Sequence, residues 1–194
     1  VVGGIALDIV DTDFLHRDWQ FNAALVGVFN NVTLANPHLF GSRTTFTTSA
    51  SVSLLKETDR FFVSGVESRL EQVTRRGQSL VLALSHPMGN YFNGRIGVSA
   101  VTEQFFGVTP KLTGKVLSGT GPGFVTPANH LLTNLYGQID FNRRGWGVTV
   151  EAESSIRSRW RAWGTPVQQA AFNPDTKNYL TWNLPLGKAF PLAN

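Results

Sequence analysis

The chain of 194 residues contains no cysteine and few charges, since Asp, Glu, Lys and Arg make up only 15% of it. Without cysteine it has neither a disulfide framework nor a thiolate metal site. A charged fraction below the usual quarter excludes charge-rich disorder and argues against a helical bundle. The sequence also lacks an apolar run of the roughly 18 residues that a transmembrane helix needs. These absences favour an all-β chain, either one domain or a piece of a larger one.

Basic residues exceed acidic ones, with 17 Lys and Arg against 13 Asp and Glu and a formal net charge of +4. They are scattered, and the only clusters are Arg75-Arg76, Arg143-Arg144 and the arginines of residues 157–161. A nucleic-acid-binding chain gathers its cations into one patch interleaved with exposed aromatic residues. The charge pattern therefore argues against a nucleic-acid partner.

Residues 45–54 form the clearest pattern in the chain. The odd-numbered residues all carry hydroxyl groups: Thr45, Thr47, Ser49, Ser51 and Ser53. The even-numbered residues are mostly apolar: Phe46, Thr48, Ala50, Val52 and Leu54. Side chains alternate across a strand, so this segment predicts a strand with one hydroxylated and one apolar face. Its length of about ten residues is what a tilted strand needs to cross a bilayer. The uncharged polar face suits a barrel lumen and a solvated face equally well.

Further segments predict more strands of this kind, about nine in all. The expected strands are residues 4–10, 19–29, 32–35, 45–54, 79–85, 92–100, 131–141, 146–152 and 180–184. Residues 60–74 fit a strand less cleanly, and a helix over residues 66–73 is the alternative. We expect turns at Asn30-Asn31 and at Arg75-Arg76-Gly77, and a charged loop tip at residues 56–59. Residues 107–129 and 157–175 are expected to be long loops.

Short and long connections alternate along the chain, with the Asn30-Asn31 turn as the exception. This layout is typical of an all-β, antiparallel, up-and-down transmembrane β-barrel, in which aromatic residues near the strand ends form interfacial girdles. The residues predicted to face lipid are Phe46, Ala50, Val52, Leu54, Trp146, Val148, Val150, Leu180 and Trp182.

Four segments carry a resemblance to a known family. They are Asp-Phe-Leu at residues 13–15, Leu-Ala-Asn-Pro-His-Leu-Phe-Gly-Ser-Arg at 34–43, Leu-Ala-Leu-Ser-His-Pro-Met at 82–88 and Asn-Arg-Arg-Gly-Trp at 142–146. In this order they resemble the barrel of the BamA-type superfamily of outer-membrane insertases and translocators. The chain departs from that family at His16, where a glycine is usual, and it lacks the family's Val/Ile-Arg-Gly-Phe/Tyr loop motif.

The resemblance implies that residues 1–194 are roughly the first half of a 16-stranded barrel, without periplasmic repeat domains. It implies a surface antigen of a Gram-negative outer membrane that folds and inserts other outer-membrane proteins, without enzyme activity and without a cofactor. The implied partners are outer-membrane lipid, the remaining strands or another chain that closes the sheet, nascent outer-membrane proteins and periplasmic proteins.

Two other functions stay open. One is a passive porin or translocator of the same architecture, and the other is a soluble β-sandwich or lipocalin-like binding module. The sequence predicts no catalytic, cofactor or metal residues. His16, His38, His86 and His130 have no ligand spacing and are expected at the surface. Glu151 and Glu153 share a strand face, which is more typical of lumen lining than of a glycosidase pair. Residues 119–123 are glycine-rich but lack the features of a phosphate-binding loop.

Overall fold

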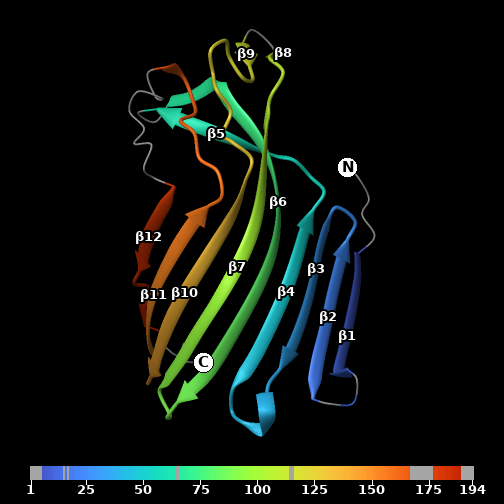
Figure 1. Ribbon diagram of the computed structural model, residues 1–194, viewed down its shortest axis with the longest axis vertical. Coiled ribbons are helices and arrows are strands. Elements are labelled where there is room, and N and C mark those ends of the chain that lie inside the picture. The colour runs from blue at the N-terminus through green and yellow to red at the C-terminus, as the bar shows by residue number, and fades with distance from the viewer. Residues whose placement is uncertain are drawn as a thin grey trace, which may run out of the picture.

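The computed structural model describes residues 6–14, 16, 18–63, 66–113, 116–166 and 177–188. Figure 1 shows that one tall sheet makes up the body of the molecule. The strands of this sheet are β1 (Ala6–Phe14), β2 (Trp19–Val26), β3 (Phe29–Asn36), β4 (Thr45–Ser53), β5 (Glu57–Val63), β6 (Val66–Met88), β7 (Phe92–Gly107), β10 (His130–Arg143), β11 (Trp146–Arg157), β12 (Asn178–Asn183) and β13 (Leu186–Lys188). A 3-10 turn, η1 (Leu39–Gly41), precedes β4, and β8 (Lys111–Thr113) pairs with β9 (Val116–Ser118) in a separate small sheet.

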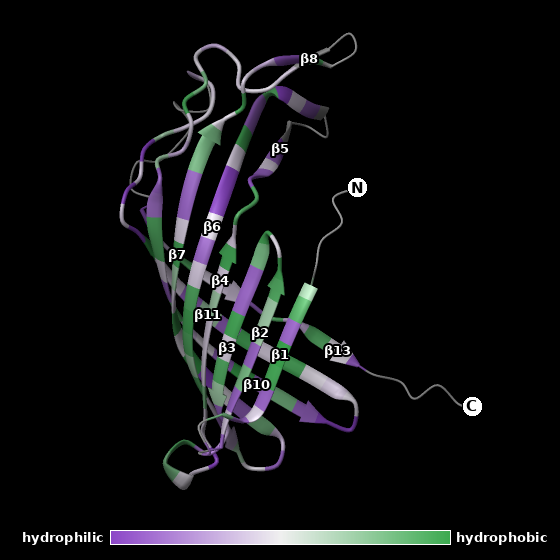
Figure 2. Ribbon diagram, turned by 90° about the vertical axis from the view of Figure 1, so that its right-hand side faces the viewer, coloured by the Kyte–Doolittle hydropathy of each residue, from purple (hydrophilic) through white to green (hydrophobic). Residues whose placement is uncertain are grey.

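The sheet is antiparallel and has an up-and-down order, β1-β2-β3-β4-β6-β7-β10-β11-β12, with β5 beside β6 and β13 beside β11. The expected all-β, antiparallel, up-and-down arrangement is therefore confirmed. The sheet is not closed, because β1 and β12 lie at opposite ends of this order. In Figure 2 both β1 and β13 lie to the right of β6 and β7, so the two edges bend toward the same side and the sheet forms a trough. Within the described ranges, no helix is long and apolar enough to span a membrane.

The connections divide into two ends, which we call the turn end and the loop end. At the turn end lie η1, the β6–β7 turn and the Arg144-Gly145 turn, and Figure 1 shows them together at the bottom of the sheet. The loop end carries β5, β8 and β9. The tight β2–β3 turn also lies there, but it falls at Gly27-Val28 and not at Asn30-Asn31 as predicted. Gly27 supplies the turn conformation with a φ of 58°. Asn30 and Asn31 therefore belong to β3, where they pair with residues of β2.

The predicted turn at Arg75-Arg76-Gly77 is wrong, because β6 runs through it without interruption. These residues are paired with β7, and the Nη2 of Arg76 donates to Oε1 of Gln104 at 2.6 Å. The predicted loop tip at residues 56–59 is also wrong beyond Lys56, since Glu57 pairs with Arg75 in the β5–β6 ladder. Glu57 and Arg75 form a cross-strand pair of opposite charges, which stabilises the pairing of β5 with β6. Residues 66–73 belong to β6, so the helical alternative for them is wrong.

The predicted loop at residues 107–129 contains the β8–β9 hairpin and folds back onto β6. The backbone N–H groups of Gly119 and Gly121 donate to the carbonyls of Arg69 and Leu70, each at 2.7 Å. The other predicted loop begins after Arg157, the last residue of β11, and its residues 167–175 lie outside the described residues. The last predicted strand, residues 180–184, corresponds to β12 and is followed by β13, and both pair with β11. Between them, the carbonyl of Pro185 accepts a hydrogen bond from the backbone N–H of Thr149 at 3.0 Å.

Candidate functional site

Strand register aligns the apolar side chains of the sheet on one side, which we call the apolar face. One row across it consists of Phe46, Leu84, Ile96, Gly137, Ala152 and Trp182, each opposite the next. Of the residues predicted to face lipid, the register places on this face Phe46, Ala50, Val52, Trp146, Val148, Val150, Leu180 and Trp182. Leu54 follows the end of β4 and is exposed.

The large side chains of the apolar face are left uncovered. Ile96 is 62% exposed, Leu135 65% and Trp182 71%. Among the described residues, the buried hydrophobic ones are only Ala23, Val73 and Ala83. A water-soluble domain of this size buries its large aliphatic and aromatic residues in a core. This sheet instead presents them outward as a continuous apolar surface.

The opposite side, which we call the polar face, is the more crowded one, as expected for the concave side of a trough. Ser155 is fully buried there, and Asn134 and Ser99 are more than nine-tenths buried. Asn134 Nδ2 donates to Ser99 Oγ at 3.2 Å, and the Ser155 hydroxyl donates to Glu153 Oε1 at 3.1 Å. Small polar groups are therefore buried on the polar face, whereas large apolar side chains are exposed on the apolar face.

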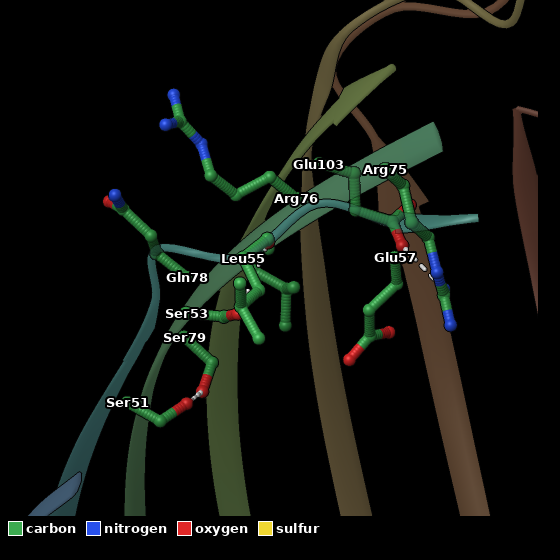
Figure 3. Close-up of a pocket in the computed structure, with 11 residues that line it drawn as sticks. Ser51, Ser53, Leu55, Glu57, Arg75, Arg76, Gln78, Ser79 and Glu103 are labelled. Carbon is green, nitrogen blue, oxygen red and sulfur yellow. Dashed lines mark hydrogen bonds and ion pairs between the residues drawn. The ribbon is translucent and has the colours of Figure 1, made fainter. Parts of the chain in front are cut away.

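A hollow of about 260 Å³ lies on the polar face near the loop end, and Figure 3 shows the side chains around it. It is lined by Ser51, Ser53, Leu55, Glu57, Arg75, Arg76, Gly77, Gln78, Ser79, Val101 and Glu103. The hydroxyls of Ser51 and Ser79 point toward one another and are 2.7 Å apart, whereas Arg76 and Gln78 point away from the rest (Figure 3). The hydroxylated parity predicted for residues 45–53 thus belongs to this face.

A chain of charged groups crosses four strands beside the hollow. Arg75 Nε lies 3.3 Å from Asp59 Oδ2, and Arg75 Nη1 lies 3.5 Å from Glu103 Oε1. The second oxygen of Glu103, Oε2, is 3.0 Å from His130 Nε2. The four residues come from β5, β6, β7 and β10, so the network ties the loop end of the sheet together.

His130 is the buried member of this network, although the sequence placed it among surface histidines. Its side chain is only 4% exposed, and its ring stacks on Phe105 with centroids 5.8 Å apart. Nδ1 lies 2.9 Å from the carbonyl oxygen of Ala128. Both ring nitrogens thus face oxygen atoms, while the contact of Nε2 with Glu103 is close but outside hydrogen-bond geometry.

The other histidines lie apart from this network. His16 Nδ1 is 3.2 Å from Asp13 Oδ2, His86 Nδ1 is 3.0 Å from Thr44 Oγ1, and His38 is exposed. Within the described residues no group of acidic and histidine side chains is arranged to hold a metal ion. The N–H groups of Gly119 and Gly121 are already bonded to β6, which leaves them unavailable to a phosphate.

No local signal in the sequence marks the charged network. Asp59, Arg75, Glu103 and His130 are separated by 16 to 28 positions, and none belongs to a motif. They meet only because β5, β6, β7 and β10 are neighbours in the sheet. Sequence reasoning therefore identified the hydroxylated strand of the site and missed its charged part.

The fold defines an open, antiparallel β-sheet with one apolar and one polar face. Comparison with known proteins finds no matching family, no similar curated protein and no similar solved structure.

Proposed function

We propose that the chain is a segment of an outer-membrane β-barrel of the insertase type, with its apolar face against lipid and its polar face toward an aqueous lumen. In this role it assists the folding and insertion of other outer-membrane proteins, without an enzymatic step. Lipid, nascent outer-membrane proteins and periplasmic proteins are the proposed partners. Further strands or another chain close the sheet.

The observation that carries the proposal is the inverted burial. Large apolar side chains such as Leu135 and Trp182 are exposed while Ser155 and Asn134 are buried. In water an exposed apolar surface of this extent is unfavourable, whereas in a bilayer it replaces lipid–lipid contacts at little cost. A trough with a polar inside and an apolar outside has the side-chain distribution of a transmembrane barrel wall.

The height of the apolar face also supports the proposal. Along β10 the apolar parity runs from Leu131 to Phe141, which spans roughly 34 Å at about 3.4 Å per residue. A strand tilted by roughly 40° then covers about 25 Å, the height of the apolar band of outer-membrane barrels.

The insertase role draws its support from the resemblance in the sequence and from the edge of the sheet. Among the described strands, β1 pairs with β2 alone. A free strand edge offers N–H and C=O groups with which an incoming strand can pair. The passive porin or translocator is the second candidate, and the hydroxylated polar face of β4 favours it. A soluble sandwich would need a second layer over the apolar face, and no described element covers that face.

Membrane insertion can be tested with single cysteines because the chain has none of its own. Leu82→Cys places a label on the apolar face and Ser49→Cys places one on the polar face. We expect an environment-sensitive fluorophore in lipid vesicles to report an apolar environment at position 82 only. Iodide should quench the label at position 49 and spare the label at 82. A chain that is folded and monomeric in buffer without detergent would contradict the proposal.

The insertase role needs a separate assay. Vesicles containing the chain should accelerate insertion of a urea-unfolded outer-membrane barrel relative to empty vesicles. Ile9→Pro in the edge strand should reduce this acceleration, because proline removes a backbone donor. A chain that permits solute entry in a vesicle-swelling assay but does not accelerate insertion would favour the porin.

A further inference from the structure

Charged side chains are distributed unequally between the two faces of the sheet. The carboxylates of β7, β10 and β11 all have the parity of the polar face: Glu103, Asp140, Glu151 and Glu153. In the described strands β6, β7, β10, β11 and β13, the arginine and lysine residues with the parity of the apolar face are Arg76, Arg143 and Lys188. These three cations lie at the two ends of that face and not in its middle.

The turn end of the apolar face finishes in one row, which we call the turn-end rim. It consists of Arg143, Trp146 and Lys188, which lie opposite one another on β10, β11 and β13. The Nζ of Lys188 is 4.8 Å from the centroid of the Trp146 ring, and the guanidinium of Arg143 is 4.9 Å from that of Tyr91. Long cationic side chains lie against aromatic rings in this way where an apolar surface meets a polar interface.

A second pair of cations, Arg76 and Lys56, lies at the other end of the apolar face, and we call it the loop-end rim. Arg76 is paired with Gln104 of β7 and points away from the hollow of the polar face (Figure 3). The Nζ of Lys56 is 4.1 Å from the centroid of the Phe106 ring, and Phe106 shares the parity of Gln104. Each end of the apolar face thus carries a cation held over an aromatic ring.

The separation of the rims matches the distance between the two headgroup layers of a bilayer. His130, the first residue of β10, lies in the row next to Arg76, and Arg143 is the last residue of β10. This length is roughly 44 Å at about 3.4 Å per residue, and a tilt of roughly 40° reduces its height to about 34 Å. A bilayer has a hydrocarbon core of about 30 Å and measures about 40–45 Å with its headgroups. Both rims therefore fall at headgroup level.

We propose that the two rims bind the phosphate groups of anionic phospholipids, one rim in each leaflet, and so fix the depth of the sheet in the bilayer. Guanidinium and ammonium groups form charge-assisted hydrogen bonds with phosphate oxygens. A zwitterionic lipid brings its own cation to the same place and gains less from the rims. The carboxylates, which would repel phosphate, face the other side of the sheet. The proposal rests on the membrane location proposed above and adds a lipid class to it.

The test uses the full chain with a single fluorophore in phosphatidylcholine vesicles. Val148→Cys places the label on the apolar face beside the turn-end rim, and the chain has no other cysteine. A fixed mole fraction of phosphatidylglycerol or phosphatidylcholine carries a nitroxide near the top of the acyl chain, where it quenches a nearby fluorophore. We expect phosphatidylglycerol to quench much more strongly. Arg143→Gln and Lys188→Gln should each reduce this preference about fivefold, because one cation near an anionic surface contributes that much.

Arg95→Gln is the matched control for these variants. Arg95 also lies over an aromatic ring, 5.8 Å from the centroid of Tyr136, but both residues have the parity of the polar face. Its replacement should leave the preference unchanged. A label at Thr102→Cys, on the apolar face near the loop-end rim, separates the two rims. Arg76→Gln should reduce the preference at this label about fivefold, whereas Arg143→Gln should not change it.

Equal quenching by the two lipids at both labels in the otherwise unmodified chain would overturn the lipid-binding rims and leave the membrane location intact. A preference at position 148 that survives in the Arg143→Gln, Lys188→Gln double variant would overturn them as well. Absence of quenching by either lipid at both labels would instead contradict the proposed function itself.

Discussion

Glu103 is the residue on which the charged network of the polar face depends. Its two oxygens contact Arg75 on β6 and His130 on β10, and its side chain is only 20% exposed. Asp59 contacts Arg75 from the outer end of the network, where both side chains are more exposed. Because solvent screens the exposed pair, the two contacts should contribute unequally to stability.

Glu103→Gln should therefore destabilise the chain by about 1–3 kcal/mol, since it replaces the carboxylate that contacts both the buried His130 ring and the partly exposed Arg75. Asp59→Asn, the matched control, should cost less than about 1 kcal/mol because its ion pair is exposed. The measurement is urea unfolding in lipid vesicles, followed by tryptophan fluorescence. Equal losses for the two variants would contradict the role assigned to Glu103.

Two glycines on neighbouring strands make a second residue-level prediction. A Cβ on Gly97 would lie 2.5 Å from the Tyr136 ring and 2.7 Å from the Leu82 carbonyl oxygen, whereas a Cβ on Gly137 would meet nothing. Gly97→Ala should destabilise the sheet by about 1–3 kcal/mol through overpacking. Gly137→Ala should be neutral or stabilising by up to about 1 kcal/mol, because alanine loses less conformational entropy. The same unfolding measurement compares them, and a tolerated Gly97→Ala would show that Tyr136 does not pack there.

At the scale of the element, β4 shows why one strand has two environments. Ala50 lies on the apolar face between Val32 and Leu80, and Ser49 lies on the polar face between Thr33 and Val81. Under the proposed function, Ala50 therefore faces lipid and its neighbour Ser49 faces the lumen.

Ala50→Arg should cost roughly 2–4 kcal/mol near the bilayer midplane, whereas Ser49→Arg should cost much less. The difference arises because the guanidinium group is dehydrated on the lipid side and hydrated in the lumen. Urea-dependent folding into vesicles measures both variants. Equal penalties at positions 49 and 50 would contradict the assignment of the two faces.

The strand β6 shows how far local sequence reasoning reaches. Alternation predicted the strand at residues 79–85, and the structure confirms that segment within β6. The Arg75-Arg76-Gly77 sequence has the composition of a turn, but β7 pairs with all three residues and β5 pairs with Arg75 on the other side. Ladder hydrogen bonds with two neighbours override a weak local turn preference, and the sequence alone does not reveal those neighbours.

At the scale of the whole molecule, the two edges of the sheet remain its distinctive feature. β1 and β12 end the strand order, and neither is paired on its outer side with a described strand. Central strands such as β6 and β7 have partners on both sides. The edges should therefore be the least protected part of the sheet.

Hydrogen exchange of the vesicle-bound chain should show slow amides throughout β7 and β10, with every second amide of β1 exchanging much faster. The reason is that an edge strand directs alternate N–H groups away from its only partner. Mass spectrometry of peptides from these strands gives the measurement. Uniform protection of β1 would show that another strand, from this chain or a second one, covers the edge.

Alternation along the sequence was enough to predict the all-β class of the fold and the two faces of its strands, because period-two alternation in segments such as residues 45–54 is a local property of the backbone. It predicted the placement of Phe46, Val150 and Trp182 on one side for the same reason. The folded structure was needed to reveal the curvature of the sheet, the continuity of β6 and the contacts among Asp59, Arg75, Glu103 and His130. Those features depend on which strands become neighbours, and pairing between residues far apart in the chain leaves no mark on the local pattern of either partner.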